Sequence, residues 1–427
     1  MRETFLIVIV IILACLALVR PRIGLYACVW FDLMRPDFFA WSANGTFPYI
    51  PVLSITTALG SLRHFQDYSI VLRNPTARCL ILLQIPVIAS VIFAVRPELA
   101  YPPFWEFERL MPIVLLIPVL IRTEEHLCTM FLVIASSLGM VGLKFGIYGL
   151  RVGGVHFADG YAGLDNNGLA SQLSMAVPIL WYSRTLVHAK LARHLFLAMI
   201  AASFAAVVMT ESRGGSLALL TAILLVTSVA RRRVAVVLLF CLLAIPPIYL
   251  VQERYFSRME TLKDPTQESS ANSRLIMAHA AFDMWKSYPL FGVGFGNQNF
   301  MVLQREYVED SRYWSLKVHN GYLQMLVDCG LFGFVLWVWL LFSVIVRLWR
   351  SAVMCRARQL ALEAYPRAMA ISLIAFAQYN LSGGRERDTI LYILVMCAAA
   401  WQAVALAEAQ QSRSAEAQIV EGEVAAV

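Results

Sequence analysis

Three basic side chains stand where they could bind a phosphate group or take up a proton. Arg213 lies between two apolar runs in VVMTESRGGSLALL, Arg274 lies in an amphipathic stretch, and His319 stands at the mouth of a long apolar run. A guanidinium can bind phosphate oxygens in a bidentate way, and an imidazole titrates near neutral pH and can accept a hydroxyl proton. Two fixed cations and one titratable base therefore suit a diphosphate substrate whose tail lies in lipid.

Each of these residues also has an ordinary structural interpretation. Arg213 could contact lipid headgroups, Arg274 could face solvent, and His319 could simply begin a helix. The functional interpretation is favoured by their shared situation, because all three lie at a boundary between polar and apolar sequence and on the same predicted face of the membrane.

The flanking residues predict how the two arginines are held. For Arg213 we expect a tight turn at Gly214 and Gly215, with Ser216 capping the helix that follows. For Arg274 we expect the first turn of an amphipathic helix at the membrane surface, where free N–H groups and the helix dipole favour an anion. The apolar face of that helix would comprise Leu275, Ala278, Phe282 and Trp285.

No cofactor or metal motif competes with these residues. The glycines of FGVGFG (Gly292, Gly294 and Gly296) form neither a P-loop nor a dinucleotide fingerprint, and we expect a sharp external turn or re-entrant bend there. The sequence has no Asp-x-Asp, no His-Glu-x-x-His and no Cys-x-x-Cys. We therefore expect no metal, no cofactor and no disulfide.

Composition places the chain in a membrane. Of 427 residues, 59% are hydrophobic and 15% are charged, against about 25% charged in soluble domains. Apolar runs recur along almost the whole length, which predicts an all-α, polytopic integral membrane protein. Residues 1–20 are expected to be an uncleaved first helix, since their positive region is a single arginine offset by Glu3.

The apolar windows are long enough for about twelve transmembrane helices. Some of the early windows are short or contain proline, so the total could differ by one and the side of the N-terminus stays open. The windows are residues 4–19, 23–34, 48–62, 79–95, 109–121, 127–147, 168–183, 194–210, 215–230, 234–251, 321–346, 368–382 and 389–407.

Loop charge predicts the orientation. Four short loops are rich in arginine and lysine and should be cytoplasmic, which puts the three candidate residues on the periplasmic face. The net charge of +7 follows from this topology and gives no reason to expect nucleic-acid binding. The basic loops lie near residues 63–78, 184–193, 231–233 and 347–367.

The same topology divides the chain into four parts. We expect an N-terminal transmembrane bundle at 1–251 and a periplasmic segment, with amphipathic helix and glycine-rich turn, at 252–319. C-terminal transmembrane helices would follow at 320–407, and an acidic, disordered cytoplasmic tail at 408–427.

Two further stretches fall on the periplasmic face. YGLRVGGVHFADG offers Arg151 and His156, and QYNLSGGRERD offers Arg385 and Arg387. Ordinary loop residues are the favoured interpretation for each of them, and we retain Arg151 alone as a secondary contact to the donor.

Together these stretches resemble the O-antigen ligase and polymerase superfamily of bacterial inner membranes. The likeness is greatest to the lipid A–core:O-antigen ligases, including the O-glycosylation ligases associated with exosortase systems, to which DLMRPDFF is similar. It covers most of the chain and rests on TESRGG, SRLIMAHAAFDMWKSYPLFGVGFGNQNF, VHNGYLQMLVDCGLFGF and GLDNNGLASQLSMAVP.

The resemblance implies a metal-independent, inverting glycosyltransferase with a GT-C-like membrane fold, acting in lipopolysaccharide biosynthesis. Its donor would be a glycan on undecaprenyl diphosphate, and its acceptor the outer-core sugar of lipid A–core. Carried over to this chain, Arg213 and Arg274 would bind the diphosphate, and His319 would activate the acceptor hydroxyl. Arg151 and Asn320 would be further substrate contacts.

Other functions stay open at this point. An O-antigen polymerase would use the same donor with another lipid-linked glycan as acceptor, and a protein O-oligosaccharyltransferase would use a protein. A transporter is disfavoured, because its polar site would lie at the bilayer midplane between inverted repeats.

Overall fold

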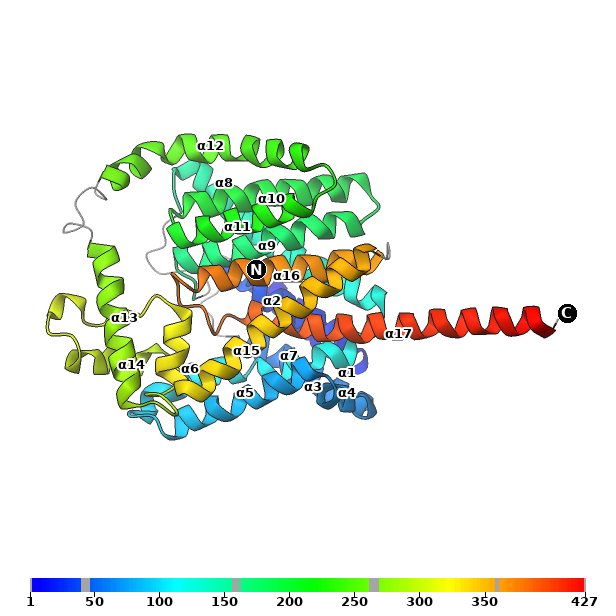
Figure 1. Ribbon diagram of the computed structural model, residues 1–427, viewed down its shortest axis with the longest axis horizontal. Helices are drawn as coiled ribbons and strands as arrows, with labels where there is room; N and C mark the ends of the chain where they lie inside the picture. The colour runs from blue at the N-terminus through cyan, green and yellow to red at the C-terminus, as the bar shows by residue number, and fades with distance from the viewer. Residues whose placement is uncertain are drawn as a thin grey trace.

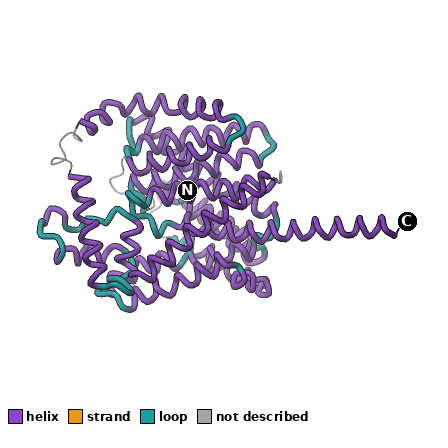
Figure 2. The backbone as a smooth tube through the Cα atoms, in the orientation of Figure 1, coloured by secondary structure: helices purple, strands orange, loops and turns teal. Residues whose placement is uncertain are grey.

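The computed structural model describes residues 2–39, 47–155, 161, 163–260, 269–357 and 361–425, with side chains left out at 2, 251–271, 361 and 411–425. In that part of the chain the secondary structure is helical, apart from one isolated bridge between Tyr161 and Leu164. The long helices run side by side and the loops gather at the two ends of the bundle (Figure 1, Figure 2). The predicted all-α fold is confirmed.

The helices follow the apolar windows of the sequence. Each predicted window overlaps one α-helix, and the helices over windows 234–251, 321–346 and 389–407 extend about 10 to 20 residues beyond the ends of theirs. The α-helices are α1 (Arg2–Val19), α2 (Pro21–Met34), α3 (Tyr49–Ser61), α4 (Ser69–Arg73), α5 (Pro75–Ile92), α6 (Pro97–Glu108), α7 (Met111–Leu120), α8 (Glu124–Val152), α9 (Asn166–Leu186), α10 (Lys190–Met209), α11 (Arg213–Val229), α12 (Arg233–Glu260), α13 (Ser269–Ser287), α14 (Asn297–Leu303), α15 (Gly321–Ala357), α16 (Ala364–Tyr379) and α17 (Thr389–Ala425).

Six of the described helices are long and apolar enough to cross a membrane. They are α5, α8, α10, α15, residues Arg233–Leu250 of α12 and residues Thr389–Gln410 of α17. The protein is therefore a multi-pass membrane protein. The remaining windows correspond to helices that are shorter or less apolar, so the total of about twelve spans stays a prediction.

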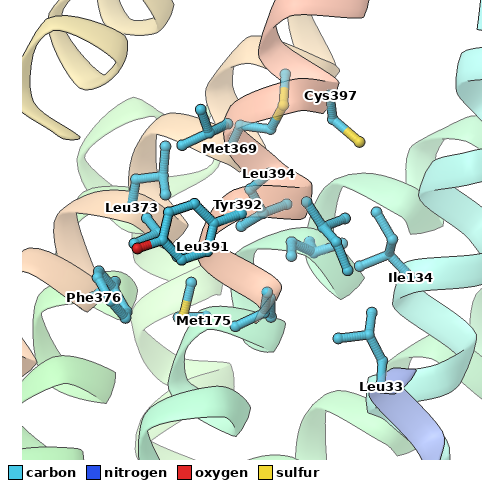
Figure 3. Close-up of a cluster of buried hydrophobic side chains, with 14 of the residues drawn as sticks. Leu33, Ile134, Met175, Met369, Leu373, Phe376, Leu391, Tyr392, Leu394 and Cys397 are labelled. Carbon is cyan, nitrogen blue, oxygen red and sulfur yellow. The ribbon is translucent and has the colours of Figure 1, made fainter. Parts of the chain in front are cut away.

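The first half of α17 is the axis of the bundle. Each residue from Ile390 to Ala400 exposes 2% or less of its surface, which explains why this stretch is apolar on every side. Figure 3 shows Tyr392 and Leu391 of α17 among Met175 of α9 and Phe376 of α16. The loop that precedes α17 is thereby anchored to the most buried element of the fold.

The two ends of the bundle differ in charge and in structure. At one end, which we call the basic end, a cavity of about 610 Å³ brings together Arg184, Arg231 and Arg367 from three of the predicted basic loops. At the other end, which we call the site end, α13 and α14 lie and α17 begins (Figure 1). These three loops thus share one end of the molecule, as the charge pattern predicted.

A broken helix and a glycine-rich turn interlock at the site end. Inside α15, Gly330 has φ 66° and ψ −168°, and a Cβ there would lie 2.2 Å from the carbonyl oxygen of Leu290. The amide of Val293 donates to the carbonyl of Val327 at 2.9 Å. The predicted turn is confirmed, since Gly292, Gly294 and Gly296 all have positive φ.

The helix α13 differs from the sequence prediction in two respects. It begins at Ser269, so Arg274 lies in its second turn and the predicted first-turn position is wrong. Its packed face carries Met277 and Met284, whereas Leu275 and Phe282 of the predicted apolar face are exposed. The helix has apolar residues on both faces, and the face that packs against the protein is not the one that the spacing of apolar residues predicted.

The tail also differs from the disordered segment that we expected. α17 continues as a helix to Ala425 and projects from the basic end (Figure 1). Residues 408–425 are rich in alanine, glutamate and glutamine, which have high helix propensity.

Candidate functional site

His319 is held at the start of α15 by a set of local hydrogen bonds. The side-chain oxygen of Asn320 accepts from the amides of Tyr322 and Leu323, both at 3.0 Å, and so caps the helix. The amide of Gly321 donates to the carbonyls of two residues in the loop after α16. His319 therefore precedes the helix start, as the apolar run after it predicted, and the structure adds the loop after α16 as its neighbour.

The backbone of His319 adopts an uncommon conformation. Its φ is 54°, in the left-handed region that residues other than glycine seldom occupy. Glu211, in the turn before Arg213, has φ 55°. Such conformations persist where the surrounding structure holds them, and they are frequent at functional sites.

The His319 side chain lines a polar cavity of about 170 Å³ at the site end. Both cationic and anionic side chains line it together with the imidazole, so it can bind polar groups and exchange a proton with a hydroxyl. Its other charged or polar lining residues include Asp165, Asn167, Lys317, Arg385, Glu386, Arg387 and Asp388.

The surroundings of the His319 imidazole favour its neutral form. Burial lowers its pKa, the positive charge of Arg274 lowers it further, and the negative charge of Asp165 acts in the opposite direction. A neutral imidazole can accept a proton, which is the state that a general base needs. Arg274 itself is half-buried on α13, which packs against α15.

Arg213 is the first residue of α11 and is exposed. It is not among the residues that line the His319 cavity, but the residue before it is bonded to one that is. Ser212 caps α11 by accepting from the amide of Gly215 at 3.2 Å. The Ser212 hydroxyl also donates to the side-chain oxygen of Asn167 at 2.7 Å, and Asn167 lines the His319 cavity. The predicted turn at Gly214 and Gly215 is wrong, because both residues belong to the first turn of α11.

The loop between α16 and α17 supplies charged residues that the sequence had ranked below Arg151. Arg385 forms an ion pair with Asp165 and lies 3.7 Å from Asp388. Burial raises the pKa of Asp388 to about 6, although the charge of Arg385 favours its ionised form. Arg387 stacks over Phe295 of the glycine-rich turn, with 5.8 Å between its Cζ and the ring centroid.

A second polar cavity, of about 250 Å³, adjoins the first. The two share Gly163, Arg385, Arg387 and Asp388 as lining residues. The rest of its polar wall comes from α2, the end of α6 and the start of α9, and includes Asp32, Arg35, Glu106, Arg109 and Gln172.

Two residues that were expected to contact substrate are placed differently from that expectation. Arg151 is exposed near the end of α8 and lines neither polar cavity. Asn320 uses its side-chain oxygen to cap α15, and its amide donates to the carbonyl of Leu381 at 3.2 Å, so both ends of its side chain bind the protein backbone. The secondary candidate His156 lies outside the described residues.

Comparisons with known families identify two regions of the chain. Residues 196–338 match the family model described as O-Antigen ligase (Wzy_C), and residues 1–185 match a family of unknown function (DUF5935). No curated protein matches the chain. The predicted resemblance to the O-antigen ligase superfamily is confirmed for a stretch that contains Arg213, Arg274 and His319.

Proposed function

We propose that the protein is an O-antigen ligase that acts as a glycosyltransferase on the periplasmic face of the bacterial inner membrane. It would transfer a glycan from undecaprenyl diphosphate to lipid A–core, with inversion at the anomeric carbon and without a metal. The family match supports a member of the O-antigen ligase and polymerase class, and the site geometry supports the role of His319.

The observation that carries the proposal is the local environment of His319. Its imidazole lines a cavity, its pKa is lowered by burial and by Arg274, and Asn167 of the same cavity binds the residue next to Arg213. A neutral base with guanidinium groups on neighbouring elements is the arrangement that glycosyl transfer from a diphosphate needs.

In the proposed reaction the acceptor hydroxyl attacks the anomeric carbon from the face opposite the diphosphate. The new bond joins the acceptor oxygen to that carbon, and His319 takes the hydroxyl proton. The bond between the carbon and the diphosphate oxygen breaks, and its electron pair leaves with the diphosphate. Arg213 and Arg274 stabilise the charge that builds up there.

A transfer assay with the purified protein tests this function. Lipid-linked O-polysaccharide and lipid A–core are the substrates, and wild type is compared with His319→Ala. Wild type should form the ligated product, and the variant should lose about 10² to 10⁴ in rate, which is typical of a missing general base. Equal rates in a folded, inserted variant would contradict the role of His319.

Two additions to the assay test the finer parts of the proposal. Replacing lipid A–core by a second lipid-linked glycan, or by a protein acceptor, separates the ligase from a polymerase and from a protein O-oligosaccharyltransferase. Wild type should prefer lipid A–core. Activity should also survive EDTA, and loss of activity that Mg²⁺ restores would overturn metal independence.

A further inference from the structure

We propose that the second polar cavity is the acceptor subsite, which holds a hydroxyl-rich, uncharged sugar ring and presents it to His319. This inference rests on the proposed function, because it assigns the place of the second substrate. The cavity adjoins the His319 cavity through Gly163, Arg385, Arg387 and Asp388. A sugar bound there could reach His319 without passing through lipid.

The wall of the cavity has the chemistry that recognises a neutral sugar. Carboxylates of Asp32 and Glu106 can accept hydrogen bonds from hydroxyls, and the guanidinium of Arg109 can donate them. The charges nearly balance, since Arg35 is paired with Asp37 at 2.8 Å and Arg385 is paired with Asp165. A phosphate or an acidic sugar would find no net excess of positive charge here.

Two polar groups of the wall, one oxygen of Asp388 and the guanidinium of Arg109, form no hydrogen bond with the described residues. The Oδ2 atom of Asp388 is buried and accepts no hydrogen bond within the described residues. Arg109 is exposed, and its guanidinium forms no hydrogen bond or ion pair among the described residues, although its charge acts on the nearby Asp32. A buried acceptor is normally satisfied, so a ligand hydroxyl is a natural partner for Asp388 at the junction of the two cavities.

The walls of this cavity are separate from the elements that carry the proposed diphosphate ligands. Arg213 and Arg274 belong to α11 and α13, whereas α2 and α6 supply Asp32 and Glu106. An inverting displacement needs the acceptor and the leaving group on opposite faces of the anomeric carbon. Separate walls on different elements fit that requirement.

The subsite also gives a role to the N-terminal region. Asp32, Arg35, Glu106 and Arg109 all lie within residues 1–185, which match the family of unknown function. The region that matches the O-antigen ligase model carries His319, Arg213 and Arg274. The N-terminal region would then determine the acceptor, while the ligase region binds the donor.

Matched pairs of variants on one helix test the inference. Glu106→Ala and Arg109→Ala remove lining groups near the end of α6, and Glu98→Ala and Arg96→Ala remove exposed groups of the same types near its start. The full-length proteins are assayed with lipid-linked O-polysaccharide and lipid A–core, each varied in turn. Each lining variant should raise the KM for lipid A–core about tenfold, as expected for one lost hydrogen bond to a charged group.

The donor measurements and the controls decide between the possible explanations. The KM for the donor and the rate at saturating acceptor should stay within about twofold of wild type, since a hydrogen-bond loss confined to the acceptor changes only acceptor binding. If the lining variants match their controls, or raise both KM values together, the subsite assignment is overturned. If wild type transfers nothing to any glycan acceptor, the proposed function itself fails, and the inference fails with it.

Discussion

The guanidinium of Arg385 is paired with the carboxylate of Asp165, across 220 positions of sequence. Asp165 caps α9 by accepting from the amide of Gly168 at 2.8 Å, and Arg385 belongs to the loop that leads into the buried α17. The pair therefore joins two walls of the His319 cavity. Its effect on Asp165 is clear, because burial alone would raise the pKa of that carboxyl, yet the charge of Arg385 holds it below the usual range.

Replacing Arg385 by alanine should destabilise the protein. Two carboxylates, Asp165 and Asp388, would lose their shared cation, and the side chain of Asp388 is only 13% exposed. Breaking a buried pair typically costs about 3–5 kcal/mol, and the half-exposed Asp165 places this case at the lower end. Thermal unfolding in detergent measures the change.

The exposed pair of Arg312 and Asp310 provides the control for that prediction. Its nitrogen and oxygen lie 2.6 Å apart, but both side chains face solvent. Arg312→Ala should leave the unfolding midpoint unchanged, because surface ion pairs contribute little. A midpoint for Arg385→Ala equal to that of Arg312→Ala would show that the pair at the cavity has no structural role.

The parts of the site that the sequence predicted depend on local patterns. His319 stands immediately before the N-cap of an apolar helix, and Arg213 immediately after a turn between two apolar helices, so each could be placed from its neighbours. Both arrangements arise where a membrane helix meets a polar loop. The family resemblance then supplied the roles.

The missed parts depend on contacts that no local pattern shows. Arg385 and Arg387 lie in a seven-residue stretch, SGGRERD, that resembles an ordinary charged loop. Their importance comes from Asp165 and Phe295, which reach them only after the bundle has assembled. The density of charge between two apolar windows was the one signal that could have ranked them above Arg151.

Arg213→Ala should reduce the rate of transfer by about 10²–10³, the usual effect of removing one group that stabilises developing charge. Arg213→Lys should recover little, because an ammonium cannot make the two parallel hydrogen bonds of a guanidinium. Single-turnover transfer from the lipid-linked donor measures both.

Arg151→Ala is the matched control for Arg213. Both arginines are exposed, but the residue before Arg213 is hydrogen-bonded to Asn167 of the His319 cavity, whereas Arg151 lies near the end of α8. The loss of Arg151 should therefore leave the rate within about twofold of wild type. If the two alanine variants lost activity equally, Arg213 would act only through general surface charge, and the proposed diphosphate binding would be wrong.

Gly330→Ala should destabilise the site end. The new Cβ would lie 2.2 Å from the Leu290 carbonyl oxygen, at a φ of +66° that alanine seldom adopts. The glycine-rich turn would have to move away from α15. Thermal unfolding should show a clearly lowered midpoint, whereas Gly384→Ala, whose Cβ would meet nothing closer than 3.6 Å, should not. Equal midpoints would mean that the turn and helix do not depend on this contact.

The pH dependence of transfer should show the lowered pKa of His319. Burial and the charge of Arg274 lower that pKa below its ordinary value of 6.5, and the base form exists above it. The acid limb of kcat/KM for the donor, where His319 takes up a proton, should therefore have its midpoint below pH 6.5. A midpoint above pH 6.5 would mean that the imidazole is not shifted in this direction.

Arg274→Gln separates the charge effect from the effect of burial. Without the guanidinium, the imidazolium form is less disfavoured, so the pKa should rise and the acid limb should move to higher pH. The midpoint of the limb should still lie below pH 6.5, because burial is the larger cause of the lowered pKa and persists in the variant. Asp165→Asn should move it the opposite way, since it removes a negative charge that raises the pKa. The exposed Arg312→Gln should leave the limb in place, and a limb that ignores both Arg274 and Asp165 would show that another group controls it.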